Sequence, residues 1–428
     1  MEIIAIGVIV FFVLCLIFSV PVFVAMGLSA MVGGYFLGGL NIFQDAALNA
    51  YNSMNSFVLL AVPLYILAGT LLEQTGLSTR LFAFAASLVS SIRGGLGVAT
   101  VIASAIFAAI SGSSVATAAT IGLVAIPILT ANGYSSGRSG ALVAGGGTLG
   151  ILIPPSIALL LYGVLTDQSI GALFVAGVVP GIALATLMAL YTIVVNPRDP
   201  SAKQATVKEI VKASTDAGAI LLLPILIFYG IYSGLATATE VAALAVLYTV
   251  IVGLFSRTLT LKKFYKAGLT ATHASVMIFM LVAFGALMTH FLTVTRVPQA
   301  LTEFIAGSGL GYFGTVSLMI GFYLVLGMFL EALSMMLITI PILFPVATAI
   351  GMDPLAFGIF VVLAIEIAQI TPPVGINLFT VSQIGKIPFE HIIKAIVPYV
   401  VIAILMMYAV AYWQEIATWL PRTMEYKQ

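Results

Sequence analysis

Charged residues are scarce in this sequence. Only 7% of its 428 residues are charged and 61% are hydrophobic, whereas an ordinary soluble domain carries about 25% charged residues. So few charges cannot cover the surface of a soluble protein of this size, which excludes a soluble enzyme. At about 20 residues per membrane-spanning helix, the chain has room for ten or more spans. We therefore expect an all-α, polytopic membrane protein whose main solvent is the lipid bilayer.

Residues that bind metals or redox centres are also few. The chain has one cysteine, Cys15, and three histidines, His273, His290 and His391. One cysteine cannot form an intramolecular disulfide, and no histidine pair has ligand spacing, which argues against an iron–sulfur cluster, haem or a catalytic metal. The formal net charge of +1 gives no sign of nucleic-acid binding. We expect no enzyme activity, no cofactor and no nucleic-acid partner.

Apolar segments between polar breaks predict the spans. Ten are read as full crossings, namely 3–19, 22–37, 57–72, 139–165, 172–195, 217–233, 241–255, 274–292, 355–382 and 392–412. Two more, 95–131 and 313–350, are read as out-and-back pairs. In this register three of the 16 lysines and arginines (Arg296, Arg422 and Lys427) face one side and the other thirteen the opposite side. Because positive loops stay cytoplasmic, the thirteen are predicted to face the cytoplasm, and ten crossings then leave both termini outside.

An internal repeat is the most informative pattern. Ile-Pro-Ile-Leu at 126–129 recurs at 340–343, and Pro-Pro at 154–155 recurs at 372–373. Both series run span, amphipathic arm, long apolar pair, Pro-Pro span and closing span, beginning at Phe57 and Ala274. Five crossings separate these starts, so the repeats have opposite orientations. Inverted repeats with broken helices indicate a secondary transporter with its site near the bilayer midplane.

The repeat divides the chain into five parts. Scaffold helices occupy 1–56, the first repeat 57–195, further scaffold helices and cytoplasmic loops 196–273, the inverted second repeat 274–415, and a periplasmic tail 416–428.

Two polar interruptions lie in the first repeat. Ser111-Gly112-Ser113-Ser114 can leave helical geometry and aim carbonyls and hydroxyls at a cation. We interpret it as the tip of a hairpin entering from the cytoplasm, the alternative being two complete spans joined by an exposed loop. The glycine-rich run and Pro-Pro-Ser at 145–156 predict a broken helix, whose freed carbonyls can bind Na⁺ and whose restart can face an anion. Its alternative is a kinked, closely packed helix.

Two more interruptions occupy matching places in the second repeat. Gly327, Glu331 and Ser334 predict a hairpin tip entering from outside, although Glu331 could instead pair with a neighbouring helix. The segment 366–377 predicts the second broken helix. Within it, Glu366 could bind a cation, carry a proton or line a polar cavity, and the sequence leaves these roles open.

These motifs together resemble a known family. Ser-Gly-Ser-Ser-Val-Ala-Thr at 111–117, the run 146–156 and Ile-Thr-Pro-Pro-Val-Gly-Ile-Asn-Leu at 370–378 resemble the large membrane subunit of tripartite ATP-independent periplasmic (TRAP) transporters, the DctM-like family. The resemblance covers essentially the whole chain, and it implies a bacterial inner membrane with both termini periplasmic. It implies an elevator mechanism, Na⁺ as the coupling ion, a separate small four-helix membrane subunit, and a periplasmic substrate-binding protein. It also implies an organic acid substrate, such as a C4-dicarboxylate or sialic acid.

The resemblance also implies site residues. Cation binding falls on Ser111, Ser113, Ser114, Gly150, Gly327, Glu331, Thr371 and Pro372. Substrate binding falls on Ser114, Thr148, Pro154, Pro155, Ser156, Gln369, Pro373 and Asn377. No intramembrane arginine is available to hold a carboxylate. Two other functions stay open: a stand-alone ion-coupled dicarboxylate carrier, and an ion-translocating subunit of a membrane enzyme complex.

Overall fold

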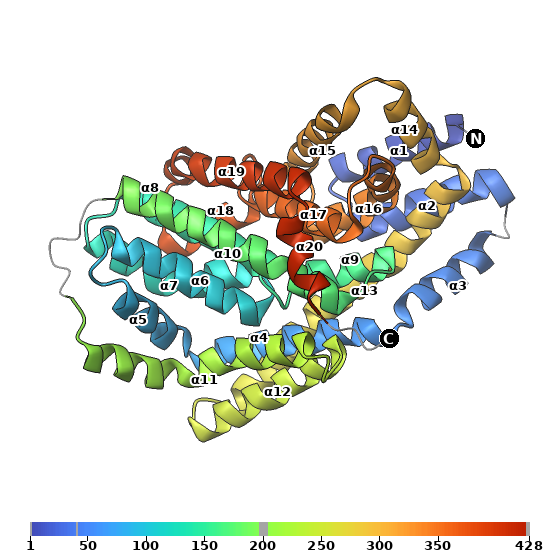
Figure 1. Cartoon of the computed structure of the whole chain (residues 1–428). Coiled ribbons are helices and arrows are strands. Elements are labelled where there is room, and N and C mark those ends of the chain that lie inside the picture. The colour runs from blue at the N-terminus through green and yellow to red at the C-terminus, as the bar shows by residue number, and fades with distance from the viewer. Residues whose placement is uncertain (1, 40–41, 197–203, 425–428) are drawn as a thin grey trace.

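The computed structural model describes residues 2–39, 42–196 and 204–424 (Figure 1). Within these ranges the chain is helical and has no strand, which confirms the all-α prediction. Nine of the described helices are long and apolar enough to cross a membrane. Arg198, Lys203 and Lys427, which entered the charge count, lie outside the described residues.

Two series of helices follow one another in the predicted order. The first comprises the short helix η2 (Phe57–Leu60), α4 (Ala61–Thr75), α5 (Ser78–Leu88), α6 (Gly95–Ser111), α7 (Ser114–Ala131), α8 (Ser136–Leu152), α9 (Ile157–Thr166) and α10 (Ile170–Val195). The second comprises α13 (Leu261–Val294), α14 (Val297–Gly307), α15 (Gly311–Gly327), α16 (Ala332–Ala349), α17 (Pro354–Gln369), α18 (Ile376–Gly385) and α19 (Phe389–Tyr412). In each series, a helix pair precedes a helix that is interrupted at two consecutive prolines.

Other helices lie outside the two series. α1 (Glu2–Ile17), α2 (Val22–Gly38) and α3 (Ile42–Met54) precede the first, and α11 (Val207–Tyr232) and α12 (Ala238–Phe255) separate the two. α3 was not predicted, because its apolar residues cover only one face of a short helix. The described part of the predicted tail at 416–428 belongs largely to one further short helix. α20 (Glu415–Arg422) packs against α10 and buries Ala417, Thr418 and Pro421.

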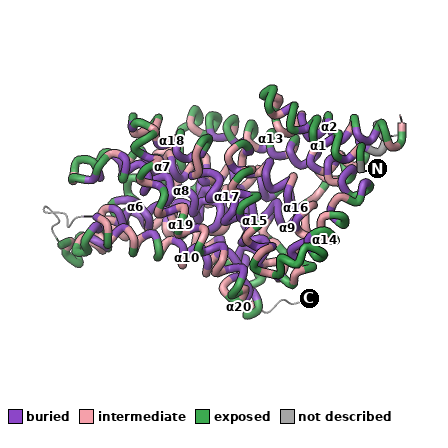
Figure 2. Tube along the Cα trace, turned by 90° about the horizontal axis from the view of Figure 1, so that it is seen from above, coloured by how far each residue is buried: buried purple, intermediate pink, exposed green. Residues whose placement is uncertain are grey.

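The interrupted helices form the centre of the molecule. α8 and α17 contact each other, and nearly every residue of both is buried (Figure 2). The opening helices of the two series, α4 and α13, also pack together, and there the Thr70 hydroxyl donates to the Ala267 carbonyl at 3.3 Å. The centre is therefore built from equivalent helices of both series.

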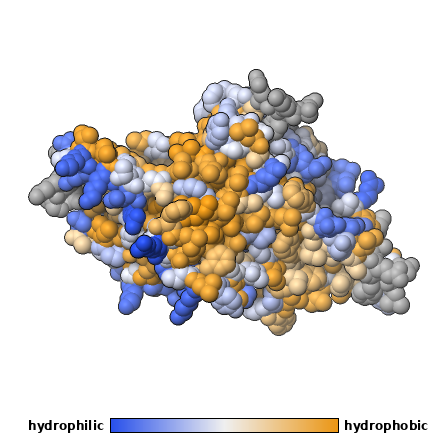
Figure 3. Space-filling model, turned by 90° about the horizontal axis from the view of Figure 1, so that it is seen from below, coloured by the Kyte–Doolittle hydropathy of each residue, from blue (hydrophilic) through white to orange (hydrophobic). Residues whose placement is uncertain are grey.

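Apolar side chains also cover much of the outside. α11 and α12 expose Leu222, Ile225, Leu244, Leu247 and Ile251. On the face shown in Figure 3, a broad apolar zone lies between hydrophilic groups at the two ends. An outer surface of this kind is stable only against lipid or another apolar surface.

Three basic residues lie near the start of α8 and its neighbours. Gly137 lies against the backbone of His391, which brings the first turn of α8 beside the first turn of α19. Arg138 belongs to the first turn of α8, and Lys394 to the second turn of α19. At the same end, Arg93 Nε donates to the Asn196 carbonyl at 3.0 Å.

Candidate functional site

The first helix pair ends in a tight polar tip. Gly112 and Ser113 join α6 to α7, and Gly112 has the left-handed backbone (φ +59°) that glycine adopts readily. Ser113 caps α7 by accepting from the Ala116 N–H at 3.4 Å. The Thr117 hydroxyl lies 2.9 Å from the Ser111 hydroxyl and donates to the Ser113 carbonyl at 2.8 Å. We call residues 111–114 tip 1; its hydroxyls are held in place by one another and by the backbone.

The first break is narrower than predicted. Gly145 to Gly150 remain helical in α8, and the interruption covers residues 153–156. Helical geometry persists because these glycines are buried where α8 meets other helices: Gly147 abuts Ala118, and Gly145 abuts Tyr399. Pro154 and Pro155 have no N–H, so the carbonyls of Gly150 and Ile151 lack their helical donors. The Ser156 hydroxyl donates to the Ile151 carbonyl and accepts from the Leu159 N–H at 3.2 Å, which starts α9.

Tip 1 packs directly against this break. A Cβ on Gly150 would lie 2.5 Å from the Ser113 carbonyl oxygen, and a Cβ on Gly112 would lie 2.7 Å from the Pro155 carbonyl oxygen. The Gly150 carbonyl, which Pro154 deprives of its donor, thus belongs to a residue in contact with the tip. Of the residues predicted to bind a cation, Ser111, Ser113, Ser114 and Gly150 are brought together.

The second break joins the same group. It covers residues 370–375, so Glu366 and Gln369 are still helical in α17 and Asn377 already lies in α18. The Asn377 side-chain amide donates to the Ser114 hydroxyl at 2.5 Å, and both side chains are buried. The Asn377 Oδ1 and Gln369 Oε1 oxygens are buried and have no hydrogen-bond partner in the described part of the chain. Two predicted substrate residues, 263 positions apart, therefore meet where tip 1 reaches the second repeat.

The second helix pair has a different construction. Residues 328–331 link α15 to α16, and we call them tip 2. The Glu331 carboxylate caps α16, accepting from the N–H groups of Leu333 and Ser334 at 3.1 and 3.2 Å. Gly327, the last residue of α15, lies against Ala368 of α17, near the second break. Tip 2 is thus capped by a carboxylate, where tip 1 is capped by a hydroxyl.

The remaining predicted residues lie along the breaks. Both Pro-Pro bonds, Pro154-Pro155 and Pro372-Pro373, are cis. The Thr148 hydroxyl donates to the Gly145 carbonyl at 2.8 Å, and the Thr371 hydroxyl donates to the Ile367 carbonyl at 2.6 Å. Each of these two hydroxyls therefore donates to a nearby backbone carbonyl, Thr148 within α8 and Thr371 to the last turn of α17.

Two residues were missed by the sequence-based site. Thr117 holds tip 1 together, and its place four residues after Ser113, one helical turn away, was the available signal. Ala368 contacts Gly327, and a small apolar residue gives no signal of this kind.

The arrangement defines a class of protein. The described residues contain no cluster of three or more metal-binding side chains, and the polar groups that converge are hydroxyls, amides and backbone carbonyls between broken membrane helices. Such sites belong to secondary transporters.

Comparison with known proteins gives the family. The model of the tripartite ATP-independent periplasmic transporter DctM component matches residues 8–416, and the chain belongs to this family of transporter permease components, which are not enzymes. It is 36% identical over 431 residues to the C4-dicarboxylate TRAP transporter large permease protein DctM of Vibrio cholerae, covering 95% of each chain. It is 33% identical over 406 residues to the isethionate TRAP transporter permease protein DctMQ of Oleidesulfovibrio alaskensis, covering 94% of this chain and 64% of that longer one.

A solved structure shares the fold. The Neisseria gonorrhoeae MtrF structure, described as illuminating a class of antimetabolite efflux pumps, aligns with a TM-score of 0.63 at 15% identity. The alignment covers 95% of this chain and 94% of MtrF. At this identity, the likeness concerns the fold alone.

Proposed function

We propose that this chain is the large permease subunit of a Na⁺-coupled transporter that takes up an organic acid, of the C4-dicarboxylate or sialic acid class, by an elevator mechanism. The observation that carries the proposal is the hydrogen bond from Asn377 to Ser114. It joins tip 1 of the first repeat to the second break, where unpartnered Gln369 and Asn377 oxygens are buried. A polar site at such a junction opens or closes when the helix pair moves relative to the breaks.

Sodium ions would bind beside the breaks. The Gly150 carbonyl has lost its helical donor to Pro154, and the Gln369 carbonyl has lost its own to Pro373. Ser113 and Ser114 lie against Gly150, whose carbonyl is the first of these two, and Ser111 belongs to the same tip. Gly327, Glu331, Thr371 and Pro372 would supply the second site from tip 2 and the second break. Carbonyl and hydroxyl oxygens are the ligands that hard cations prefer.

The substrate carboxylate would bind between the tips. The helices α7, α9 and α18 all start here, and helix N-termini attract anions. The Asn377 and Gln369 side chains add amide groups, while Thr148, Pro154, Pro155, Ser156 and Pro373 shape the walls. Because Asn377 and Ser114 are fully or almost fully buried, substrate entry requires their contact to open.

One observation supports movement of one body against another. The 31-residue segment Ser136–Thr166 contacts tip 1 near its middle, so the α6–α7 pair reaches half-way along it, as a hairpin entering from one side would. The bodies would be a transport domain built on the two tips and breaks, and a scaffold of the remaining long helices. The basic end of the molecule would face the cytoplasm and both termini the periplasm.

The transporter would work with two partners. A small four-helix membrane subunit would hold the scaffold, and the longer isethionate relative, of which this chain covers 64%, leaves room for such a segment. A periplasmic substrate-binding protein would deliver and select the acid.

Reconstitution tests the proposal. The chain and its small subunit are placed in liposomes with a Na⁺ gradient, and uptake of radiolabelled succinate or sialic acid is measured with and without the binding protein encoded beside them. With the same pH on both sides of the membrane, we expect uptake only with the Na⁺ gradient and the binding protein together. Uptake without the binding protein would instead indicate a stand-alone carrier, and ion flux without solute would indicate a subunit of an ion-pumping complex.

A further inference from the structure

Glu366 is a buried acid that the proposed transport mechanism does not use. It lies in α17, one turn before the second break, and its side chain is fully buried. Among the residues that the structure describes, neither carboxylate oxygen has a hydrogen-bond partner. Burying an ionised carboxylate without a partner costs several kcal/mol or more. The carboxyl in this closed arrangement therefore needs a bound cation.

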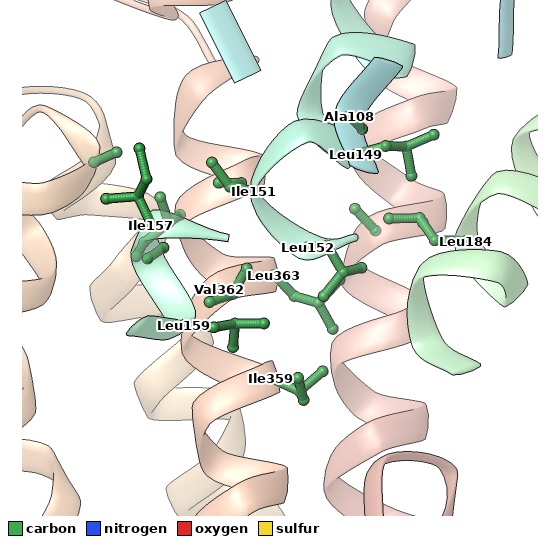
Figure 4. Packing of buried hydrophobic residues seen from close by; sticks show 14 of the residues in the cluster. Ala108, Leu149, Ile151, Leu152, Ile157, Leu159, Leu184, Ile359, Val362 and Leu363 are labelled. Carbon is green, nitrogen blue, oxygen red and sulfur yellow. The ribbon is translucent and has the colours of Figure 1, made fainter. Parts of the chain in front are cut away.

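Helical spacing shows which side of α17 carries this acid. Ile359, Val362 and Leu363 precede Glu366 by seven, four and three residues, so they share its face. Figure 4 shows these three side chains beside Leu152 and Leu159, which flank the first break. Ala368, which contacts Gly327 of the second helix pair, points to the other side of α17. Glu366 thus faces the junction of the two interrupted helices.

Titratable groups on the elements around α17 have partners elsewhere or lie at helix ends. α16 and α18 carry none, α8 has only Arg138 in its first turn, and α20 has Glu415 and Arg422. The first turns of α19 carry Glu390, His391 and Lys394. Five tyrosine hydroxyls form hydrogen bonds with other groups: Tyr162 with Pro354, Tyr323 with Thr339, Tyr399 with Thr192, Tyr408 with Ser317 and Tyr312 with Ala411. The other two tyrosines make ring contacts, Tyr191 with Tyr399 and Tyr412 with Tyr312.

The surroundings favour a proton over a metal ion. Hard metal ions such as Ca²⁺ or Mg²⁺ take about six or more oxygen ligands, whereas the side chains that share the Glu366 face are apolar apart from Gln369. A proton needs only one carboxylate oxygen. It forms an O–H bond on the carboxylate and returns to water when the acid ionises, so no further reactant is required.

We propose that Glu366 is the proton-binding site of this transporter, loaded when the site closes and emptied when it opens to the cytoplasm. The proposal rests on the function proposed above. Closing the contact between Ser114 and Asn377 excludes water from the break one turn away from Glu366. A site that binds the proton better when closed must take up a proton on closing, by linkage. Uptake would then carry protons inward together with the acid.

Proton flux in proteoliposomes tests this inference. The complete complex is reconstituted with a pH-sensitive dye inside, Na⁺ equal on both sides and an inward pH gradient, and substrate uptake and substrate-induced acidification are recorded together. We expect both with the unmodified chain. We expect Glu366→Gln, which mimics the neutral acid, to lose acidification and its response to the pH gradient while retaining substrate exchange. Glu209→Gln, at an exposed helix cap, is the matched carboxyl-to-amide control and should behave as the unmodified chain.

Different failures have different meanings. No Na⁺-driven uptake by the unmodified chain overturns the proposed function itself. Na⁺-driven uptake without acidification, or identical acidification by Glu366→Gln, overturns only the proton site. Lower ²²Na⁺ flux per substrate in Glu366→Gln would identify the acid as a sodium ligand and also overturn it. If Glu366→Gln does not fold, the infrared carboxylic-acid band of the unmodified protein decides, because it must change on substrate binding.

Discussion

The side-chain amide of Asn377 donates to the hydroxyl of Ser114 at 2.5 Å, across 263 positions of sequence. One residue starts the helix after the second break, and the other starts the helix after tip 1. Through this buried hydrogen bond, tip 1 of the first repeat contacts the second break of the second repeat.

A double-mutant cycle on this pair measures the coupling. Removing one partner leaves the other buried and unsatisfied, so Ser114→Ala and Asn377→Leu should each destabilise the protein by about 1–3 kcal/mol. The double variant should lose less than the sum, with a coupling of about 1 kcal/mol. Thermal unfolding in detergent gives the stabilities. Additive losses would show that the two side chains do not interact.

One added methyl group should disrupt the packing of tip 1 against the first break. Gly150→Ala would bring Cβ to 2.5 Å from the Ser113 carbonyl oxygen, so we expect a loss of about 1–3 kcal/mol from overpacking and at least tenfold slower uptake. Gly218→Ala is the matched control, because nothing lies within 4 Å of its Cβ. That substitution should stabilise α11 by up to about 1 kcal/mol and leave uptake unchanged. Equal behaviour of the two variants would contradict the contact.

The contact of α15 with α17 offers a second comparison within one helix. Gly327→Ala would place Cβ 2.8 Å from Ala368 Cα, whereas Gly321→Ala has open space around it. We expect Gly327→Ala to slow uptake severalfold, because the backbone of either helix must shift, and Gly321→Ala to have no effect. Uptake rates in proteoliposomes at matched protein content check this. A normal uptake rate in Gly327→Ala would mean that α15 does not pack against α17 at Ala368 during transport.

The proposed sodium ligands can be separated from the cap that one of them forms. Ser113→Ala combined with Thr371→Ala should raise the Na⁺ concentration for half-maximal uptake at least severalfold. The loss of the α7 cap by itself costs about 0.5–2 kcal/mol. Ser135→Ala removes an N-cap bond of the same 3.4 Å length from α8 and should leave the Na⁺ dependence unchanged. An unchanged Na⁺ dependence in the double variant would remove these residues from the cation sites.

Glu331 has a visible role as a cap and a proposed role as a cation ligand. Glu331→Asn keeps a capping side chain and removes the charge, whereas Glu331→Ala removes both. We expect only Glu331→Ala to lower stability, by about 1 kcal/mol, and both variants to raise the Na⁺ requirement. Unfolding temperatures and Na⁺ titrations of uptake separate the effects. If Glu331→Asn retains the normal Na⁺ dependence, the carboxylate is only a cap.

Much of this architecture could be predicted from sequence, because lipid imposes strong constraints. Long apolar runs gave the spans, and paired prolines located both interruptions. The extent of the first break was misjudged, because Gly145 to Gly150 can equally leave a helix or let helices approach. In the structure these glycines contact Ala118 and Tyr399, and the segment stays helical. α3 and α20 are amphipathic, and their apolar content falls below that of a span.

The candidate site was predictable in composition but not in connectivity. Serines, prolines and amides stood out in an apolar chain, whereas the pairing of Ser114 with Asn377 depends on how two distant repeats pack. The resemblance to a family supplied the expected ligands. Thr117 could have been found, since it repeats a hydroxyl one turn after Ser113.

The hydrogen bonds inside tip 1 decide which sign of charge it attracts. The Thr117 and Ser111 hydroxyls both donate toward the Ser113 carbonyl, at 2.8 and 3.3 Å. Hydroxyl oxygens whose hydrogens are engaged in this way present lone pairs to their surroundings. We therefore expect this part of tip 1 to attract cations, and an anion at the same place to rely on the amides and helix starts around it, or on a cation already bound.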